Sequence, residues 1–200
     1  MKKFITAISL QGKDLQKTKY KYADNPALAC DEEVSFPILI TINNFVQKGD
    51  NIKIVPIIIN AESSNNNYTT FNKEIEELAQ KKGFSYEIQP VIKELGDTVD
   101  DMLQLFSSLI ENVSDEDHLF ACITYGTKPI SILEIMALHY AYKVKKDVKI
   151  EKIVYGSGPW EGSMIYDTTP LFYVDSSIES LAKLKLEHPE NALRVMLGLE

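Results

Sequence analysis

Short apolar runs of strand length alternate with longer segments of helical periodicity along most of this chain. Parallel strands need a crossover between them, and that crossover is usually a helix, so the alternation predicts βαβ units. The expected fold is therefore α/β, with a Rossmann-like, mainly parallel sheet and helices on both of its faces. We expect strands at 4–8, 17–22, 52–59, 84–89, 118–124 and 148–155, and helices at 35–46, 70–82, 98–112 and 129–142.

Particular residues at the ends of the helical segments support this assignment. Gly83 follows the segment 70–82, at the position where a helix end favours a left-handed residue. Thr98 and Asp101 have the spacing of a capping box. The segment 35–46 is open to two interpretations, because its β-branched residues favour a strand while its Ser-Phe-Pro start favours a helix. We expect a helix there.

The chain is expected to form one domain and a short C-terminal helical tail. Its 200 residues suit a single core, and no internal repeat or long linker divides them. Residues 60–67 are expected to be a polar loop. We expect the domain to span 1–175 and the tail 176–200, with one or two helices broken near Pro189. The dense apolar residues of the tail indicate packing on the domain or in a dimer seam.

Charge and composition exclude several classes of protein. The chain has 29 acidic and 21 basic residues and a formal net charge of −8, whereas general binders of nucleic acid or anionic membranes need a basic surface. A local basic pocket for a small phosphorylated ligand is compatible with this charge. The apolar start of the chain is short and lacks a cleavage site, and no apolar run reaches the length of a membrane span. We therefore expect a cytoplasmic protein.

The cysteines and histidines do not have the spacing of a metal site. Cys30 and Cys122 are far apart and sit beside apolar or small residues, which indicates buried, reduced thiols. The histidines have no carboxylate or cysteine at ligand spacing, so packing or surface roles are expected for His118 and His139 and a turn for His188. We expect neither a metal nor a cofactor.

Two groups of acidic residues resemble catalytic pairs at first sight. Asp97, Asp100 and Asp101 fall in the first turn of a helix, where negative charge complements the helix dipole. Residues 115–117 are expected to form a solvated turn. Neither group predicts acid–base catalysis.

Common nucleotide-binding and hydrolase motifs are missing from the sequence. It contains no P-loop and no Gly-x-Ser-x-Gly nucleophile elbow. Residues 156–162 are close to the dinucleotide fingerprint, but they have one residue too many before the last glycine and follow the last strand rather than the first. That motif has little meaning outside its structural context, so we do not expect a dinucleotide there.

A run of polar residues, Thr-Tyr-Gly-Thr-Lys at 124–128, follows the strand expected at 118–124 and precedes Pro129. In open α/β sheets ligands bind beyond the carboxyl ends of the strands. Backbone amides at the start of the next helix, with Thr127 and Lys128 beside them, suit phosphate or ribose oxygens. A plain polar loop with a glycine turn is the other interpretation, and the residues alone do not decide between the two.

This segment resembles the Asp-x-Thr-His-Gly signature of the CRISPR-associated Rossmann-fold (CARF) proteins of type III CRISPR systems. Thr124 and Gly126 match the signature, whereas Cys122 stands in place of its Asp and Tyr125 in place of its His. The resemblance therefore rests on the loop together with the layout of the chain around it.

The layout is similar to that family over residues 1–175. A strand ending in Tyr155-Gly156 follows in the same place, and the opening at 8–12 with a tyrosine-containing strand after it is also similar. The resemblance implies a homodimer that binds a cyclic oligoadenylate across its twofold axis, each subunit presenting the same loops to half of the ring. The residues that it implies as ligand contacts are Ser9, Gln11, Gly12, Lys13, Thr124, Tyr125, Gly126, Thr127, Lys128 and Ser157.

The expected function is that of a cyclic oligoadenylate sensor in type III CRISPR antiviral defence, which binds cyclic tetra- or hexa-adenylate and regulates an effector protein or domain. One alternative is a ring nuclease that cleaves this ligand without a metal, by attack of a ribose 2′-hydroxyl on the neighbouring phosphate. Lys13, Thr127 and Lys128 would then be catalytic. The other alternative, unrelated to the family, is an enzyme on a Rossmann-like sheet that uses a nucleotide or sugar phosphate.

The length and sequence of the C-terminal tail indicate whether it could itself be an effector domain. It is too short for an independent catalytic domain and lacks the Arg-x-x-x-x-His pair of effector ribonucleases. We expect either a stand-alone sensor or the sensor half of a longer protein.

Overall fold

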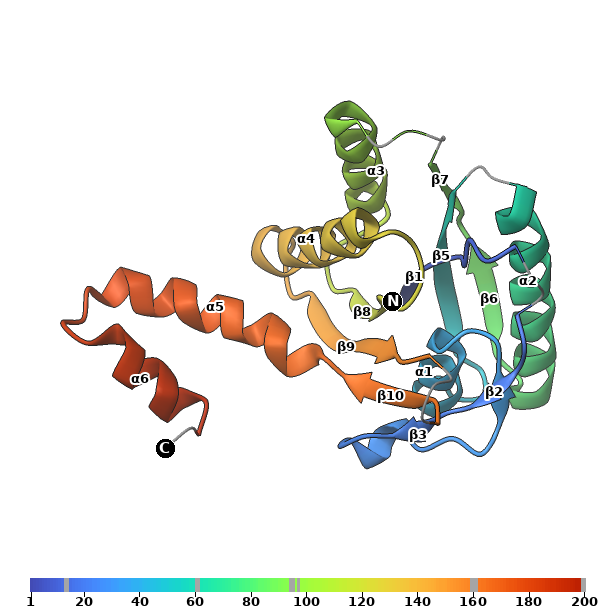
Figure 1. The fold of residues 1–200 in the computed structure, drawn as a ribbon, viewed down its shortest axis with the longest axis horizontal. Helices are drawn as coiled ribbons and strands as arrows, with labels where there is room; N and C mark the ends of the chain where they lie inside the picture. The colour runs from blue at the N-terminus through green and yellow to red at the C-terminus, as the bar shows by residue number, and fades with distance from the viewer. Residues whose placement is uncertain (13–14, 60–61, 94–95, 97, 159–161, 199–200) are drawn as a thin grey trace. The chain divides into compact units, whose positions relative to one another are not determined.

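A computed structural model describes residues 1–12, 15–59, 62–93, 96, 98–158 and 162–198 (Figure 1). In chain order its elements are β1 (Lys2–Ala7), β2 (Thr18–Lys19), β3 (Lys21–Tyr22), η1 (Pro26–Leu28), β4 (Glu33–Val34), α1 (Ile38–Phe45), β5 (Asn51–Ile59), α2 (Glu62–Lys82), β6 (Ser85–Ile88), β7 (Val91–Lys93), α3 (Val99–Glu111), β8 (His118–Cys122), α4 (Lys128–Val144), β9 (Lys149–Gly156), β10 (Met164–Asp167), α5 (Thr169–Leu184) and α6 (Pro189–Met196).

The main sheet confirms the expected α/β fold. Among the described residues it has eight strands, in the order β3-β10-β9-β8-β1-β5-β6, with β7 also paired to β5. The pairs β1–β5, β1–β8, β5–β6, β5–β7 and β8–β9 are parallel, and β10 runs antiparallel to β9. The order β6-β5-β1-β8-β9 is that of a Rossmann-like sheet.

The strand order reverses at the centre of this sheet. From β1 the chain moves outward on one side through β5 and β6, and it then returns to pair β8 with the other edge of β1. A crevice opens at such a switch point, outside the carboxyl ends of the two central strands. Here those ends lead into residues 8–12 after β1 and residues 123–127 after β8.

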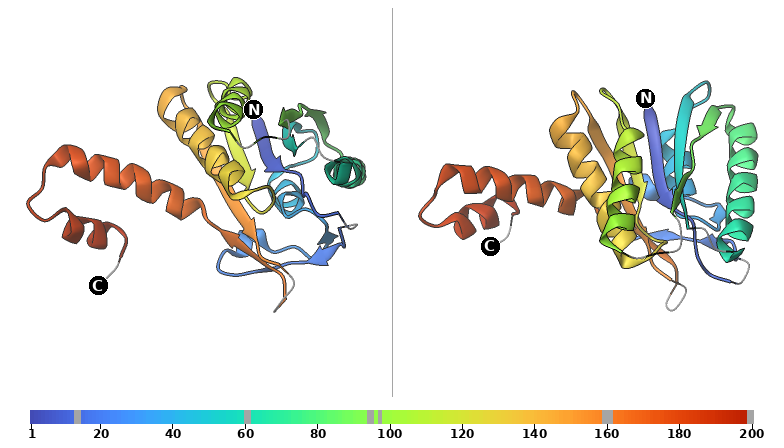
Figure 2. Two further views of the ribbon diagram at one scale, coloured as in Figure 1. Left: turned by 45° about the horizontal axis from the view of Figure 1, so that its top comes forward. Right: turned by 90° about the horizontal axis from the view of Figure 1, so that it is seen from above.

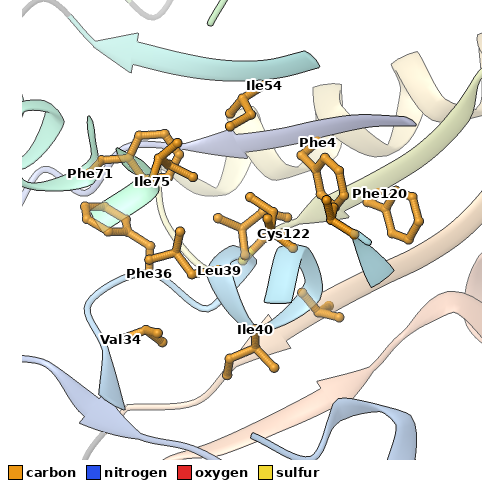
Figure 3. Close-up of a cluster of buried hydrophobic side chains, with 14 of the residues drawn as sticks. Phe4, Val34, Phe36, Leu39, Ile40, Ile54, Phe71, Ile75, Phe120 and Cys122 are labelled. Atoms are coloured by element: carbon orange, nitrogen blue, oxygen red, sulfur yellow. The ribbon is translucent and has the colours of Figure 1, made fainter. Parts of the chain in front are cut away.

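Helices cover both faces of the sheet, as expected (Figure 2). On one face α1 and α2 bury their apolar side chains with those of the strands, in the cluster shown in Figure 3. Phe4 and Phe120, from β1 and β8, stack with ring centroids 4.6 Å apart, and each such buried side chain stabilises the fold by about 1.5–3 kcal/mol. On the other face α3 packs against α4, where the rings of Phe106 and Tyr140 meet edge to face.

Helix ends agree with the sequence in two places. Thr98 and Asp101 form the expected capping box at the start of α3. Gly83 follows α2 with a left-handed φ of 74°, which a residue with a side chain adopts only at a cost. The helix at α1 also confirms the choice made for residues 35–46.

The expected polar loop at 60–67 is wrong for residues 62–67, because α2 begins at Glu62. These residues are poor helix formers by propensity. Two of them gain hydrogen bonds outside the helix: the Ser64 hydroxyl donates to the nearby carbonyl of Ile59, at the end of β5, and the Asn67 amide donates to carbonyls of the loop after β1. The partners of Asn67 are distant in the sequence and cannot be seen in a local pattern, and these bonds offset the weak propensity.

Short strands were also misjudged. The single strand expected at 17–22 is two, β2 and β3, which belong to different sheets, because Tyr20 between them turns into the core. β7 and β10 were not expected at all, since three or four residues give too little periodicity to detect. α5 begins at Thr169 rather than near 176.

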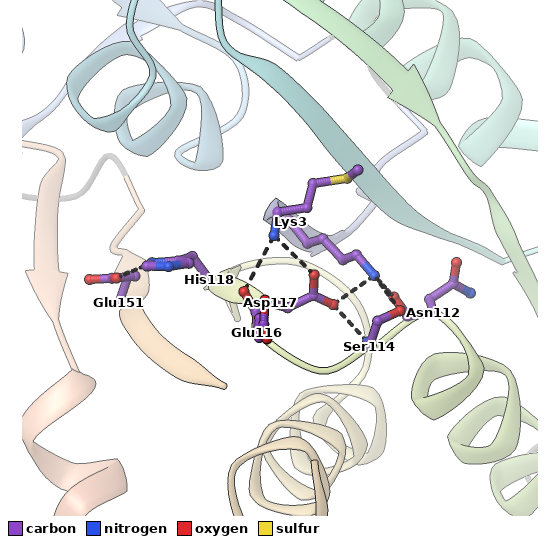
Figure 4. A network of polar contacts seen from close by, with 8 residues as sticks. Lys3, Asn112, Ser114, Glu116, Asp117, His118 and Glu151 are labelled. Atoms are coloured by element: carbon purple, nitrogen blue, oxygen red, sulfur yellow. Dashed lines mark hydrogen bonds and ion pairs between the residues drawn. The ribbon is translucent and has the colours of Figure 1, made fainter. Parts of the chain in front are cut away.

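The acidic turn at 115–117 is not fully solvated, which corrects a further expectation. Asp117 forms an ion pair of 2.7 Å with Lys3, and the two side chains are only 3% and 7% exposed. The backbone N–H of Ser114 donates to the same carboxylate, and the Lys3 ammonium also donates to the carbonyl of Asn112 (Figure 4). A charge pair buried at the amino edge of the sheet needs this many partners to offset its desolvation.

The chain divides into two compact units, Met1–Asp167 and Thr168–Glu200. In the second unit α5 and α6 contact each other, and Leu184, Val195 and Met196 are exposed. None of the helices in the described ranges has the length and hydropathy needed to cross a membrane.

Candidate functional site

Hydrogen bonds to backbone groups of the loop after β1 hold this loop in place. The Asn67 side-chain amide, from α2, donates to the carbonyls of Ser9 at 2.8 Å and Gln11 at 3.0 Å. The Ser9 hydroxyl accepts from the Gln11 N–H at 3.2 Å, which closes a tight turn. The Gln11 side chain stays exposed beside this turn. The loop is therefore a preformed surface rather than an unsupported connection.

The loop after β8 is fixed to the neighbouring strand β9 by Thr124. Its hydroxyl accepts a hydrogen bond of 2.7 Å from the Gly156 N–H and lies 3.1 Å from the Cys122 sulfur. Burial raises the pKa of the Cys122 thiol to about 11, so this sulfur stays protonated at neutral pH. Cys122 is buried as expected, whereas Cys30 is only half-buried.

Tyr125 points its hydroxyl into the domain. The hydroxyl donates to the backbone carbonyl of Ser35 at 2.8 Å, and the ring packs edge-on against Phe36 with centroids 5.7 Å apart. Burial, and next the neighbouring Tyr20, raise the pKa of the Tyr125 phenol. What Tyr125 offers to a ligand is its ring and backbone, because its proton is already donated.

Gly126 brings this second loop against the end of β1. Its φ is 93°, and a Cβ atom placed on it would lie 3.0 Å from the Cβ of Ala7 and 3.3 Å from Cγ2 of Ile130. Only glycine meets both demands without a shift of the backbone.

The start of α4 offers less to an anion than the sequence suggested. Pro129 has no N–H, and the N–H of Ile130 donates to the carbonyl of Thr127 at 3.0 Å. The Thr127 hydroxyl makes no helix cap, and its buried oxygen has no hydrogen-bond partner among the described residues. Lys128 is exposed. The groups for a ligand at this helix start are thus the Thr127 hydroxyl and the Lys128 ammonium.

Two hollows open between these loops. One, of about 320 Å³, is lined by residues 9–11 and 124–126. The other, of about 480 Å³, is lined by Gln11, Leu15, Gln16, Thr18, Tyr20, Thr124, Tyr125, Tyr155, Gly156, Ser157, Gly158 and Ser163. They share Gln11, Thr124 and Tyr125. Together they lie at the switch point of the sheet.

The lining is uncharged in the part of the chain that the structure describes, and it mixes polar groups with leucine and tyrosine side chains. A ligand there meets hydroxyls, amides, tyrosine rings and backbone groups. The positive charge expected beside them would come from the exposed Lys128 and from Lys13, which lies outside the described residues. In the described ranges no cluster of His, Cys, Asp or Glu is suited to hold a metal ion.

The remaining expected site residues have structural roles or none. The Ser157 hydroxyl accepts from the Met164 N–H at 3.1 Å, which closes the turn between β9 and β10, although Ser157 also lines the larger hollow. Gly12 is exposed, and a Cβ on it would meet nothing within 4 Å. Of the near-fingerprint at 156–162, residues 159–161 lie outside the described residues.

Sequence reasoning missed several residues of the site. Leu15, Gln16, Thr18 and Tyr20 line the larger hollow because the segment after the first loop folds back over it. Asn67 supports the first loop from α2. Tyr20 carried a signal, since it stands in an alternating polar and aromatic segment; Asn67, inside a polar run, carried none.

No model of a known protein family matches this chain, and no curated protein sequence matches it.

Proposed function

We propose that this domain binds a cyclic oligoadenylate as a sensor of type III CRISPR antiviral defence, in the manner of the CARF proteins that its sequence resembles. The observation that carries the proposal is the pair of fixed loops, 9–11 and 124–126, which border two hollows with shared lining residues at the switch point of a Rossmann-like sheet. This is the position where open α/β sheets bind nucleotides.

The chemistry of the lining suits riboses and adenine edges. Gln11 lines both hollows and carries both a donor and an acceptor, so its side chain can bond a ligand there. The Thr127 hydroxyl, at the start of α4, is buried without a partner among the described residues and would need a small shift of that helix start to reach a ligand. Backbone amides and carbonyls of the two loops add further partners. Phosphates would lie toward Lys128, at the exposed start of α4. The proposed ligand needs no metal or further cofactor for binding.

A homodimer is part of the proposal. Val99 and Leu103 of α3, and Ile132 and Met136 of α4, are large apolar side chains that remain exposed. Each pair is spaced by four residues and so shares one face of its helix. α4 follows β8 and so begins next to the loop 124–126 that borders the hollows, and α3 packs against α4. A second copy packed on this surface would bring its own loops to the other half of a ring.

The biological setting follows from this ligand. The sensor would act in the cytoplasm and pass the signal to an effector protein or domain. A ring nuclease would use the same loops, with Thr127 and Lys128 near the reacting ribose and phosphate, so turnover has to be measured together with binding.

The test is to incubate the purified protein with cyclic tetra-adenylate or cyclic hexa-adenylate, and then to follow thermal unfolding and separate the nucleotides by chromatography. A sensor is expected to show a rise in Tm with one of these rings and to return the ring intact, because binding to the folded state alone stabilises it. Replacing Lys128 by Gln should reduce the rise. The matched control is Lys149→Gln, an exposed lysine at the start of β9 and thus at the opposite edge of the sheet.

Linear products that disappear in Lys128→Gln or Thr127→Val would identify the ring nuclease instead. No shift and no cleavage with either ring would overturn the proposal and favour an enzyme that uses another nucleotide or a sugar phosphate.

A further inference from the structure

Three hydrogen bonds connect the candidate site to α2 through Ser35. The Tyr125 hydroxyl donates to the carbonyl of Ser35 at 2.8 Å. The same Ser35 donates its N–H to Oε2 of Glu74 at 3.0 Å and its hydroxyl to Oε1 at 2.6 Å. Ser35, in the segment that leads into α1, thus joins the binding loop to a carboxylate on α2.

Glu74 is placed to hold this link firmly. It is 6% exposed, and both of its carboxylate oxygens accept a hydrogen bond from Ser35. The residues beside the link are packed: Phe36 lies edge-on to Phe71 of α2 as well as to Tyr125. A buried carboxylate whose two oxygens both accept hydrogen bonds is held in one orientation. It therefore also fixes the backbone of Ser35, to which it is bonded.

The other end of the link reaches a third hollow. Glu74 lines a cavity of about 150 Å³ between β4, α1 and α2, which also contains Val34, Leu39 and Leu78. At its rim Lys17 pairs with Glu77, and Lys81 pairs with Glu32. A movement of Tyr125 would therefore also affect this cavity, whose lining includes residues of α2.

We propose that Glu74 is a positioning residue of the binding site, which acts through Ser35 and Tyr125 to hold the loop 124–126 in the shape that borders both hollows. This inference rests on the proposed function and deepens it, because it makes α2 the element that reads the state of the binding loop. Glu74 itself does not touch the ligand.

The choice of substitution follows from the chemistry of the link. Ser35 presents two donors, and a carboxylate supplies two acceptors, whereas an amide supplies one acceptor oxygen and a competing NH₂ group. Glu74→Gln therefore keeps the size of the side chain but removes its charge and one of its two acceptors, which weakens its hold on Ser35. Tyr125→Phe removes the other end of the link without changing the ring. Glu77→Gln is the matched control, because it lies on the same helix and at the same cavity but is not part of the link.

Affinity for cyclic tetra-adenylate, or for the hexa-adenylate if that ring binds more tightly, would be measured by calorimetry on protein whose folding is verified by thermal unfolding. We expect Glu74→Gln and Tyr125→Phe each to weaken binding about tenfold. We expect the double variant to be about as weak as either single variant, because both changes break one link. Glu77→Gln should bind within about twofold of the unaltered protein.

A second readout does not depend on any ligand. In protein labelled with ¹³C at the tyrosine Cζ, the Tyr125 resonance is identified by its loss in Tyr125→Phe, and it reports the bond made by that hydroxyl. Glu74→Gln is expected to shift it, and Glu77→Gln is not. If Glu74→Gln fails to fold, Ser35→Ala, which removes only the hydroxyl bond to Glu74, takes its place in both measurements.

The two readouts separate the two proposals. If neither ring binds the unaltered protein, the proposed function fails, and the resonance alone decides whether Glu74 positions Tyr125. If a ring binds but Glu74→Gln leaves both the affinity and the resonance unchanged, or if the effects of the two variants add, the positioning role is overturned while the proposed function stands.

Discussion

Gly126 and Ala7 lie so close that a Cβ atom on Gly126 would be 3.0 Å from the Cβ of Ala7. This contact is where the loop after β8 meets the end of β1, beside the start of the other loop of the candidate site. It makes the shape of the hollows depend on a residue without a side chain.

Gly126→Ala is accordingly expected to destabilise the domain by about 1–3 kcal/mol, because the left-handed φ and the contact with Ala7 both penalise a methyl group. Urea unfolding measures the loss. Gly12→Ala serves as the control, since a Cβ there meets nothing within 4 Å and its φ is not left-handed. Equal stabilities of the two variants would contradict the close approach.

Asp117→Ala is expected to cost about 3–5 kcal/mol, because it leaves the Lys3 ammonium buried without its counter-charge. The variant should show a large fall in Tm. The comparison is Asp31→Ala, which breaks the ion pair of 3.0 Å with Lys19, both partners being exposed, and which should leave Tm unchanged. If Asp117→Ala also left Tm unchanged, the ion pair with Lys3 would not be buried in solution.

Glu134 of α4 predicts a pH dependence of stability. It is 1% exposed, and neither carboxylate oxygen has a hydrogen-bond partner among the described residues, so burial raises its pKa well above the usual value. The folded state therefore holds this proton more tightly than the unfolded chain does. The stability that this tighter proton binding adds is fully present below the unfolded pKa of about 4.3. It is lost as the pH rises toward the folded pKa.

Glu134→Gln mimics the protonated form at every pH. Relative to this variant, the unaltered protein should lose stability steadily as the pH rises from about 4.3, as measured by urea unfolding across that range. Glu111→Gln, an exposed glutamate on α3, should show no such divergence. Parallel pH curves for Glu134→Gln and the unaltered protein would mean that this carboxyl is not desolvated.

The two cysteines are expected to differ in reactivity. The pKa of the buried Cys122 thiol is raised to about 11, and the half-buried Cys30 is reachable from solvent. Iodoacetamide at neutral pH should therefore modify Cys30 in the folded protein and both cysteines after unfolding, since the thiolate is the reactive form. Mass spectrometry of the peptides distinguishes the two sites, and early modification of Cys122 would contradict its burial.

The parts of the fold that could be predicted are those set by local pattern. The long strands β5 and β9 and the helices α3 and α4 have clear periodicity and end signals such as Thr98, and all were expected. The start of α2 was not, because Ser64 and Asn67 gain their partners only when β5 and the first loop are in place.

The residues of the candidate site also fall into those that the local sequence predicts and those that it does not. Thr124 and Gly126 could be found, because a polar run after an apolar strand marks a loop at the carboxyl edge of the sheet. The inward turn of the Tyr125 hydroxyl could not, since its acceptor is a backbone carbonyl ninety residues away in sequence. The burial of Asp117 likewise depends on Lys3, which is distant from it in the sequence.

The central place of β1 has a consequence for synthesis on the ribosome. One edge of β1 pairs with β5, but its other edge pairs with β8 and waits for residues 118–122 to be made. Until then the nascent chain displays an unpaired, apolar strand edge, which is the kind of surface that invites misassembly. The larger hollow is completed only when β9 and then Ser163 have followed, so the candidate site forms late, after most of the first unit has been translated.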